Sequence, residues 1–438
     1  MRKHWRASHA KPGEGSQPPN ASVLEEVTTK RLQAPKGTFD VLPEEGATRL
    51  YLLSTADNVL GRAGYWPVET PVFEDTELFT RGVGEATDIV QKEMFSFEDK
   101  GGRSLTLRPE ATAGVCRAYV EHGMHKLPQP VKVWCWGPFF RHEAPQAGRY
   151  RQFTQLNVEA LGSDDPSVDA ELILLLAELL REAGVEGSRL RLSSLGDADT
   201  RRAYAEELRG YLRGREGELS EDVRNRIELN PLRAFDSDHE GTRAVMAGAP
   251  RLIDRLKDAD GEHFAEVRAL LDEAGQEYEL DPTLVRGLDY YTRTIFEFES
   301  DRLGAQRGIG GGGRYDGLVE QLGGPPTPGV GWAAGIERIL LATERAGHMA
   351  RAPVFVAVAK PEARHQAFGL ARRLRDAGIR AEMEQAGRSI KGQLKHADRL
   401  GARVTVIVGD RIEVKDMESG DQRPADSPEE AVRMVSGS

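Results

Sequence analysis

The residues of this chain that are best suited to chemistry are concentrated in a few short charged segments. The stretch FRHEAPQAGRYRQFTQ, residues 140–155, places three arginines, a histidine and a glutamate around an Ala-Pro-Gln-Ala-Gly centre. Arginine carries a permanent charge on a planar fork that grips phosphate or carboxylate oxygens in two places. What a hairpin gains from these charges depends on which face of a sheet carries them.

Alternation along the return strand of this hairpin separates polar from apolar side chains. In a strand, successive side chains point to opposite faces. One face therefore carries Phe153, Gln155, Asn157 and Glu159, and the other carries Leu156, Val158 and Ala160. The apolar face predicts burial against a core, whereas the polar face either meets solvent or lines a site.

Three further segments carry polar groups next to predicted strand ends or helices. Each has a plain structural explanation, as a helix cap, a surface pair or a salt bridge, and Arg338 on its own fits a surface role. Together they are candidates for a site. The residues are Arg108 and Glu110 in LTLRPEATA, Arg286, Asp289, Tyr290 and Tyr291 in LVRGLDYYTRTIFEFE, and Glu337 and Arg338 in GWAAGIERIL.

A glycine run in RGIGGGGRYDGL matches the spacing of a dinucleotide-binding fingerprint at Gly308, Gly310 and Gly313. The match is weak, because that fingerprint belongs in a βαβ unit and no such unit surrounds it. The sequence also has no Gly-Lys-Ser/Thr phosphate loop. If the chain binds a nucleotide, arginines must hold much of its phosphate charge.

The elements that must position these residues follow from hydrophobic periodicity. A helix is expected to begin at Pro43, with Leu50, Leu53 and Leu60 at helical spacing, and to close at Gly64. An antiparallel sheet flanked by helices fits the order of the next elements better than alternating βα units do. The expected strands are 105–108, 131–141, 150–160 and 292–299, and the expected helices are 110–122 and 168–183.

The pattern changes twice further along the chain. The charged, amphipathic segment at about 198–281 predicts a helical insertion in the sheet domain. From Pro353, strands and helices alternate through VFVAVA, EARHQAFGLARRLRDAG, IRAEME, SIKGQLKHADRLG and RVTVIVG, which indicates a separate α/β domain. After Asp410 the chain is acidic and is expected to be irregular. The expected domains are 35–345 and 352–438, after a disordered extension over 1–34.

Composition limits the classes of protein. The chain has 438 residues, 39% hydrophobic and 29% charged, and no apolar run long enough for a membrane span. Only Cys116 and Cys135 are present, without metal-ligand spacing or an obvious disulfide role, which fits a reducing cytoplasm. The net charge is −11, yet residues 351–410 carry twelve Lys/Arg against six Asp/Glu, so that this segment either faces a polyanion or is a solvated surface.

Seven blocks in order resemble the histidyl-tRNA synthetase family, a class II aminoacyl-tRNA synthetase family, from about residue 35 to near the C-terminus. The RGLDYY and GGRYDGL blocks are particular to the histidine enzymes and their close relatives. The blocks are PKGTFD, GEATDIVQKEMFSFED, LRPEATA, GPFFRHEAPQAGRYRQFTQLNVEALG, LVRGLDYYTRTIFE, GGGRYDGL and GVGWAAGIERIL. The resemblance implies an α+β catalytic core with an antiparallel class II sheet and a helical insertion, followed by a separate α/β anticodon-binding domain.

The resemblance also implies the activity: ATP-dependent attachment of L-histidine to its tRNA through a histidyl-adenylate, with Mg²⁺ bridging phosphate oxygens. Catalytic and ATP-binding roles fall on Arg141 at the α-phosphate, Arg286 on the other side of that phosphate, and Arg338 at the γ-phosphate. No metal ligand of the protein can be named from the sequence. Among the histidine-binding residues, Glu159 and Tyr291 face the imidazole, and Glu110, Thr112 and Gln155 hold the α-ammonium group, with Tyr290 beside them.

Partners follow from the same resemblance. Gln146 and Arg151, which flank the hairpin turn, are candidate tRNA contacts, although Ala144 and Ala147 stand where basic residues are usual in the family. The segment GYWPVETPVFED resembles the class II motif that builds a dimer interface, so a cytoplasmic homodimer is expected. The alternative is a synthetase-like regulatory subunit of ATP phosphoribosyltransferase, which shares the fold but charges no tRNA.

Overall fold

The structure is a computed structural model that describes residues 32–84, 87–304, 307–343 and 354–436. The extension expected over residues 1–34 falls outside this part of the chain except for its last three residues. The boundary expected between residues 345 and 352 also lies outside it. Among the described helices, none is both long enough and apolar enough to cross a membrane.

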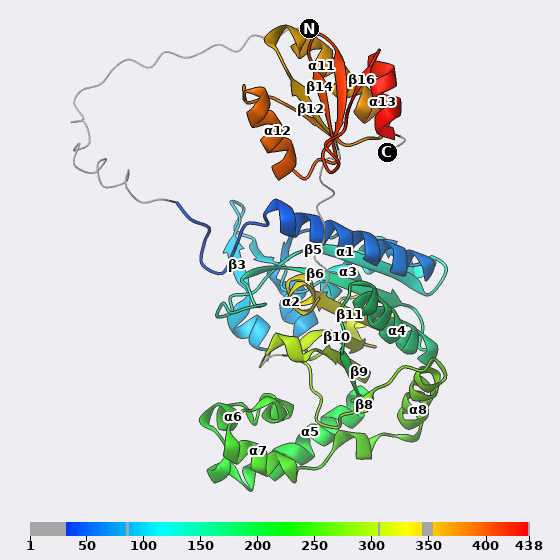
Figure 1. The fold of residues 1–438 in the computed structure, drawn as a ribbon. Helices are drawn as coiled ribbons and strands as arrows, with labels where there is room; N and C mark the ends of the chain where they lie inside the picture. Colours follow the sequence, from blue (N-terminus) through cyan, green and yellow to red (C-terminus); the bar gives the residue numbers. More distant parts are fainter. Residues whose placement is uncertain (1–31, 85–86, 305–306, 344–353, 437–438) are drawn as a thin grey trace, which may run out of the picture.

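An eight-stranded sheet forms the centre of the larger, N-terminal part (Figure 1). Its strands lie in the order β1, β5, β6, β11, β10, β9, β7, β8, and all neighbours are antiparallel except β1–β5 and β7–β8 at the two ends. The predicted antiparallel sheet is therefore confirmed. The strands are β1 (Trp66–Pro67), β5 (Val131–Phe140), β6 (Gln152–Leu161), β7 (Arg189–Ser194), β8 (Glu279–Leu280), β9 (Thr292–Glu299), β10 (Gly308–Arg314) and β11 (Gly329–Gly335).

A second, three-stranded sheet lies beside the first. Its strands are β2 (Phe73–Asp75), β4 (Ser104–Leu107) and β3 (Phe95–Glu98), with β4 in the middle. The strand predicted at 105–108 therefore exists, but it pairs with its neighbours in sequence and not with the hairpin at 131–161. The chain runs from β4 through Glu110 to the start of α3 (Thr112–Glu121).

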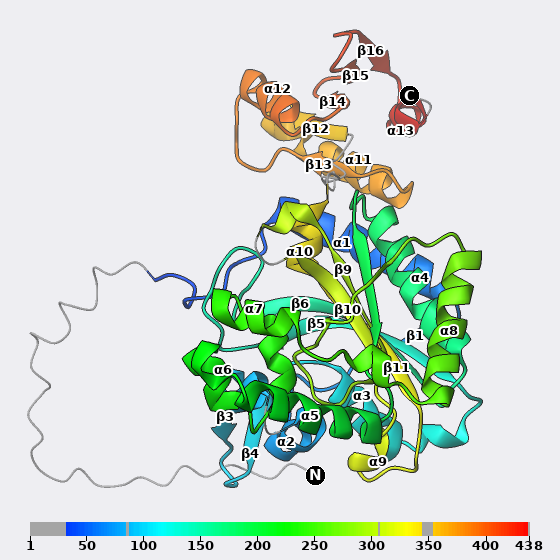
Figure 2. The same ribbon diagram turned by 90° about the horizontal axis from the view of Figure 1, so that it is seen from below.

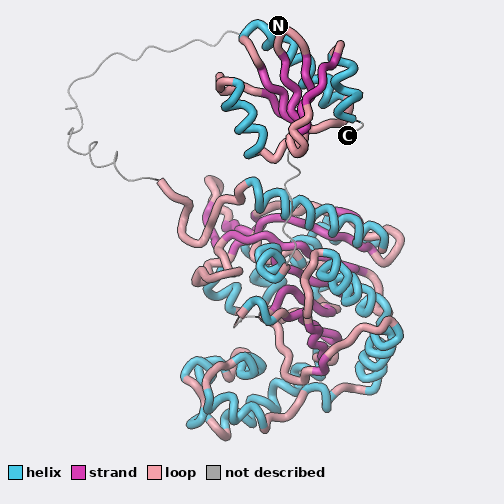
Figure 3. Tube along the Cα trace, viewed as in Figure 1, coloured by secondary structure: helices cyan, strands magenta, loops and turns pink. Residues whose placement is uncertain are grey.

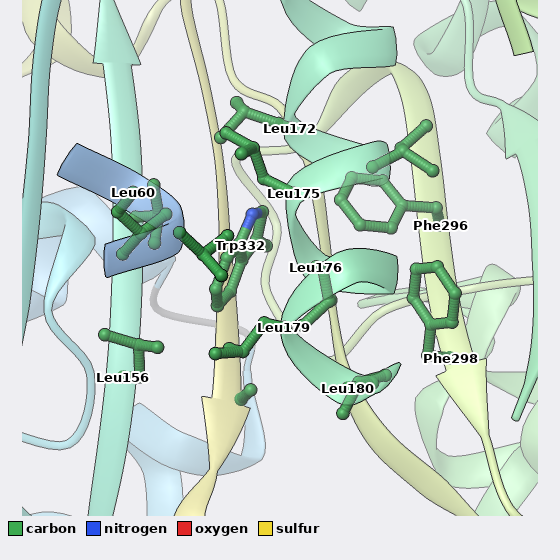
Figure 4. Close-up of a cluster of buried hydrophobic side chains, with 14 of the residues drawn as sticks. Leu60, Leu156, Leu172, Leu175, Leu176, Leu179, Leu180, Phe296, Phe298 and Trp332 are labelled. Carbon is green, nitrogen blue, oxygen red and sulfur yellow. The ribbon is translucent and has the colours of Figure 1, made fainter. Parts of the chain in front are cut away.

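One face of the central sheet is covered by α1 (Pro43–Arg62), α4 (Pro166–Glu182) and α8 (Asp258–Glu273). Helices α4 and α8 lie side by side (Figure 2). The apolar face predicted for the return strand is buried here, where Leu156 and Trp332 meet the leucines of α4 (Figure 4). On α1 the buried side chains include Leu52 and Leu60, whereas Leu50, which had been expected on the apolar side, is 68% exposed.

Helix α3 and the short helix α9 (Leu318–Gln321) pack on the opposite face through Val115, Tyr119 and Leu318. Two more short helices flank the sheet: α2 (Thr76–Val83) leads to a π-helical turn at Ile89–Glu93, and α10 (Ile336–Ala342) follows directly after β11. Because α3, α10 and the ends of the long strands come together at one side, polar residues from distant blocks meet there.

The segment between β7 and β8 is almost wholly helical (Figure 3). It contains α5 (Ala198–Arg213), α6 (Glu221–Arg226) and α7 (Glu240–Ala247) before it returns through α8. Asp197 caps α5 by accepting a hydrogen bond of 2.7 Å from the backbone N–H of Thr200. The apolar side chains of α5, α6 and α7 form a cluster of their own, which Tyr291 and Ile295 of the N-terminal part join.

The C-terminal unit has a five-stranded sheet in the order β13, β12, β14, β15, β16, with α11 and α13 on one face and α12 on the other. The irregular structure expected after Asp410 is wrong, since two strands and a helix follow. The strands after Asp410 are short and have one face toward solvent. On the first of them, buried Ile412 and Val414 therefore alternate with charged residues. The elements are β12 (Val354–Val358), α11 (Arg364–Asp376), β13 (Ala381–Met383), α12 (Ile390–Arg399), β14 (Val404–Val408), β15 (Ile412–Asp416), β16 (Gln422–Ala425) and α13 (Pro428–Ser436).

Candidate active site

A cavity of about 390 Å³ opens on the polar face of the central sheet. Phe153, Gln155 and Asn157 of the return strand line it, so this face meets a cavity and not open solvent. Eight of the residues singled out in the sequence come together in its wall, although they lie in blocks far apart along the chain. They are Glu110, Thr112, Arg141, Gln155, Arg286, Tyr290, Tyr291 and Arg338.

Glu110 is fixed at the start of α3. Its carboxylate accepts hydrogen bonds from the backbone N–H groups of Thr112 at 2.7 Å and Ala113 at 2.9 Å, where the helix leaves donors free. Burial raises the pKa of Glu110, and these donors oppose the rise. The hydroxyl of Tyr290 lies 3.5 Å from Glu110 Oε2. A carboxylate held in this way is a rigid acceptor for a cationic group.

Glu159 is 1% exposed and does not itself line the cavity, but it contacts Thr112 and Tyr315, which do. The hydroxyls of Thr112 and Tyr315 donate to its two oxygens at 2.7 Å and 2.6 Å. Burial raises the pKa of Glu159 to about 8, although both hydroxyl donors favour the charged form. Gly331 on the neighbouring strand leaves the room for this carboxylate, because a Cβ there would collide with Oε2.

The loop before β9 contributes two tyrosines and an arginine. The rings of Tyr290 and Tyr291 lie 4.8 Å apart between centroids, and Tyr290 also meets the ring of Tyr315 at 5.7 Å. Arg286 forms an ion pair of 2.6 Å with Glu297 of β9. This pair holds the guanidinium in the cavity wall, so that its orientation is fixed without a ligand.

The hairpin holds a second charged group. Arg141 donates from Nε to the carbonyl of Pro109 at 3.0 Å, and its guanidinium carbon lies 5.6 Å from the ring centroid of Phe153. Glu143 lies 3.0 Å from Arg149 and 3.9 Å from Arg141. Arg141 and Arg149 are therefore held by one carboxylate in the cavity wall.

Arg338 projects from α10 into the same cavity and donates from Nε to the carbonyl of Gly308. Burial and the nearby charge of Arg149 lower its pKa. The adjacent Glu337 is buried and accepts from the backbone N–H of Thr154 at 3.0 Å and from Arg49 at 2.8 Å. These bonds tie α10 to the hairpin, and this fixes Arg338 relative to Arg141.

The glycine run at 308–313 is strand β10, between β9 and β11. A Cβ at Gly310, Gly311, Gly312 or Gly313 would collide with the backbone or side chains of the neighbouring strands. The glycines therefore permit close strand packing and open the cavity floor at Gly310 and Gly311. No phosphate-binding turn forms there, and this removes the basis for the dinucleotide fingerprint.

Gln146 and Arg151 lie outside the cavity wall. Gln146 is exposed at the hairpin turn, where its backbone pairs with that of Arg149. Arg151 is half-buried: its backbone N–H donates to the carbonyl of Gly37 at 2.8 Å, and its Nε donates to the carbonyl of Glu143 at 3.3 Å. Gln146 is thus presented outward, whereas Arg151 supports the base of the turn.

Sequence reasoning did not assign a role to several residues of the cavity. Glu143 and Arg149 lay in the quoted hairpin, and strand parity had already put Phe153 on the correct face. Glu297 could have been suggested by its parity with Glu299, because both point to one side of β9. Tyr315 gave no signal beyond its presence in GGRYDGL.

Comparisons with known proteins agree with the geometry. Residues 37–339 match the family described as histidyl-tRNA synthetase, and residues 353–435 match an anticodon binding domain. The histidine–tRNA ligase of Rubrobacter xylanophilus is 48% identical over 421 residues, covering 92% of this chain and 99% of the relative. The apo crystal structure of S. aureus histidyl-tRNA synthetase covers 92% of this chain and 99% of its own at 36% identity, with a TM-score of 0.77.

A Bacillus halodurans structure described as an ATP phosphoribosyltransferase regulatory subunit/histidyl-tRNA synthetase is more distant. It is 22% identical, covers 87% of this chain and 99% of its own, and has a TM-score of 0.64, so the likeness is one of fold alone. The family match spans the whole catalytic part, and the relative at 48% identity spans nearly the whole chain. The chain therefore belongs to the histidyl-tRNA synthetase family.

Proposed function

We propose that this cavity joins histidine to ATP and that the chain then transfers the histidyl group to its cognate tRNA, as a histidine–tRNA ligase. In the first step a carboxylate oxygen of histidine bonds to the α-phosphorus, and the bond from that phosphorus to pyrophosphate breaks. In the second step a terminal hydroxyl of the tRNA attacks the carbonyl carbon, which releases AMP and a proton. The observation that carries the proposal is the meeting of arginines and a buried polar pocket in one cavity.

The arginines act on phosphate charge. Arg141 is assigned to the α-phosphate, Arg286 to its other side near the attacking carboxylate, and Arg338 to the γ-phosphate. Fixed cations lower the energy of a phosphoryl transition state because they need no reorganisation as charge develops. The contacts of Arg141 with Pro109 and of Arg286 with Glu297 support these roles, since they orient each guanidinium before a substrate binds.

The buried polar groups select histidine. A neutral imidazole has one donor and one acceptor nitrogen, so its pocket must supply one of each. Glu159 and Tyr291 are assigned to the ring. Glu159 already accepts two hydroxyl donors, and its pKa of about 8 means that it holds a proton near neutral pH; the carboxyl can therefore donate to the acceptor nitrogen of the ring, or accept from its N–H once ionised.

The α-ammonium group of histidine is assigned to Glu110, Thr112 and Gln155, beside Tyr290. Within the described part of the chain, Oε1 of Gln155 is buried without a hydrogen-bond partner. An acceptor in this state is costly unless a ligand donor reaches it. This orphaned oxygen, next to the rigid carboxylate of Glu110, supports a cationic group at this end of the cavity.

Mg²⁺ is assigned to the phosphates of ATP. It binds through one or two carboxylates together with phosphate oxygens, and no protein cage is needed. Glu297 and Glu299 line the cavity from one side of β9 and fit such a donor set. When bound, the ion would neutralise phosphate charge. Among the described residues no cluster of three or more acidic, His or Cys side chains forms a separate metal site.

The tRNA is proposed to meet two parts of the chain. The C-terminal unit is assigned to the anticodon, in keeping with its match to an anticodon binding domain and the basic excess of residues 351–410. The hairpin turn is assigned to the acceptor end, with Gln146 at its exposed tip and Arg151 at its base. Phosphate contacts of this kind weaken as salt concentration rises.

A homodimer is proposed because the edge of the catalytic part carries exposed apolar side chains. Trp66 of edge strand β1 is 74% exposed and Phe73 is 52% exposed, in the segment that resembles the class II dimer motif. Exposed apolar side chains that gather into a patch typically mark an interface, and Trp66, Val72 and Phe73 are all exposed within this one segment of the sequence. Equilibrium sedimentation should give twice the mass of one chain, and Trp66→Asp should shift the protein toward monomers.

The place of action is proposed to be the cytoplasm. Cys116 and Cys135 are both buried free thiols, as expected in a reducing compartment. The overall function is tested by aminoacylation, in which the purified protein, ATP, Mg²⁺ and labelled histidine should charge cognate tRNA. Absence of charged tRNA from a folded sample, with a control synthetase active in the same mixture, would contradict the proposal.

A further inference from the structure

We infer that the helical insertion forms part of the histidine site, because Arg201 of α5 holds the backbone on both sides of Tyr290. This inference rests on the proposed function and assigns a positioning residue to the same cavity. Arg201 touches no substrate in this arrangement; it acts through the loop that carries Arg286, Tyr290 and Tyr291.

The contacts of Arg201 are directed at the loop backbone. Its Nη1 donates to the carbonyl oxygen of Asp289 and, at 3.0 Å, to that of Tyr291. Its Nη2 lies 3.4 Å from Oδ1 of Asp289. The two carbonyls bracket the Tyr290–Tyr291 pair, so one guanidinium holds the peptide unit before Tyr290 and the one after Tyr291. The side chain is 21% exposed, and this keeps the bonds largely out of water.

A second side chain from the same insertion meets the same loop. Asn230 donates from Nδ2 to Oδ1 of Asp289 at 3.0 Å. The loop is confined from the catalytic side as well, because the backbone N–H of Asp289 donates to the carbonyl of Val83 at 3.3 Å and Gly84 packs against its side chain. Asp289 therefore connects the loop that carries Tyr290 and Tyr291 to the insertion on one side and to the end of α2 on the other.

Apolar packing agrees with these polar contacts. Tyr291 and Leu284 belong to the hydrophobic cluster that holds the insertion together, with Leu232 and Tyr204. Tyr290 lines the histidine cavity and also a second cavity of about 720 Å³ between α5 and the catalytic part. The rings that border the histidine pocket thus rest on the insertion.

When few hydrogen bonds hold a loop in its binding conformation, the loss of one of them lets the loop adopt other conformations more often. Without Arg201, two carbonyl oxygens lose their donor, and the loop occupies its binding conformation for a smaller fraction of the time. The apparent affinity for histidine falls by that fraction. Arg141 and Arg338 lie on other elements, and Arg286 is held separately by its ion pair with Glu297 of β9, so the affinity for ATP should change less than that for histidine.

The test compares Arg201→Met with Arg202→Met in the full-length protein. Arg202 is the adjacent residue on α5, its side chain is 74% exposed, and it forms a local ion pair of 3.3 Å with Asp199 of the same helix. Histidine-dependent ATP–pyrophosphate exchange gives KM for histidine and for ATP. We expect Arg201→Met to raise the KM for histidine by about tenfold and that for ATP by less than about twofold, with Arg202→Met unchanged.

Arg201→Lys should recover part of the histidine affinity, because an ammonium group can still donate to one carbonyl. If thermal unfolding shows that Arg201→Met does not fold, Asn230→Ala takes its place, and its KM values for histidine and ATP are compared with those of Arg202→Met in the same way. Equal KM values for histidine in Arg201→Met and Arg202→Met would overturn the inference, and so would equal rises for histidine and ATP. An unaltered protein without histidine-dependent exchange would contradict the proposed function itself, which is a distinct result.

Discussion

The hydroxyl of Tyr315 lies 2.6 Å from Oε2 of Glu159, which joins the loop after the glycine strand to the return strand of the hairpin. Both side chains are almost completely buried. With Thr112 on the other carboxylate oxygen, this bond fixes Glu159 beside the proposed histidine pocket before histidine binds. Preorganisation of this kind lowers the cost of binding.

Tyr315→Phe should weaken histidine binding. The change leaves one oxygen of a buried carboxylate without its donor, which typically costs about 1–3 kcal/mol, so the KM for histidine should rise by about tenfold. Tyr119→Phe is the matched control, because Tyr119 is also buried but donates to Gln129 at 3.1 Å, away from the cavity. The same KM in both variants would show that the Tyr315 hydroxyl does not hold the pocket.

The raised pKa of Glu159 predicts how stability depends on pH. The pKa is about 8 in the folded protein and about 4.3 in an unfolded chain. Between these values the folded state keeps a proton that the unfolded state has lost, so the free energy of unfolding falls as pH rises. Urea unfolding should show the unaltered protein losing stability relative to Glu159→Gln from about pH 5 to about pH 8. A constant or rising difference would mean that the folded carboxyl is ionised throughout.

Arg286→Lys should lower turnover more than it weakens binding. Lysine keeps the charge but lacks the planar fork that reaches both Glu297 and a phosphate. Because charge on the α-phosphate grows in the transition state, kcat for adenylation should fall by about 100-fold while the KM values for histidine and ATP change much less. Single-turnover adenylation with both substrates saturating measures this, and an unchanged kcat with a raised KM would argue for a role in binding alone.

The two ends of the hairpin should serve different steps. Arg141→Ala removes a phosphate donor from the cavity, so adenylate formation should drop by about 100-fold or more. Gln146→Ala should spare pyrophosphate exchange but slow the transfer of histidine to tRNA, with Gln152→Ala as a control at another exposed glutamine of the hairpin. Transfer at the unaltered rate by Gln146→Ala, measured from preformed adenylate, would remove the turn from acceptor-end recognition.

The sequence predicted the antiparallel sheet and the face of the return strand because both depend on local alternation. Eight residues of the cavity were named in another way, from the ordered blocks that resemble the histidyl-tRNA synthetase family. The contacts of Tyr315 with Glu159 and of Arg201 with the loop were not predicted, because each depends on how segments far apart in sequence pack together. The strands after Asp410 were missed because they are short and because charged residues separate Ile412 and Val414 on β15.

The central claim is that this cavity activates histidine and no other amino acid. Amino-acid-dependent ATP–pyrophosphate exchange, run with each of the twenty amino acids and Mg²⁺, tests it most directly. We predict exchange with histidine alone, because Glu159 and Tyr291 require a ring with both a donor and an acceptor nitrogen, and chelation of Mg²⁺ should abolish it. No exchange with histidine in a folded sample, or equal exchange with another amino acid, would contradict the claim.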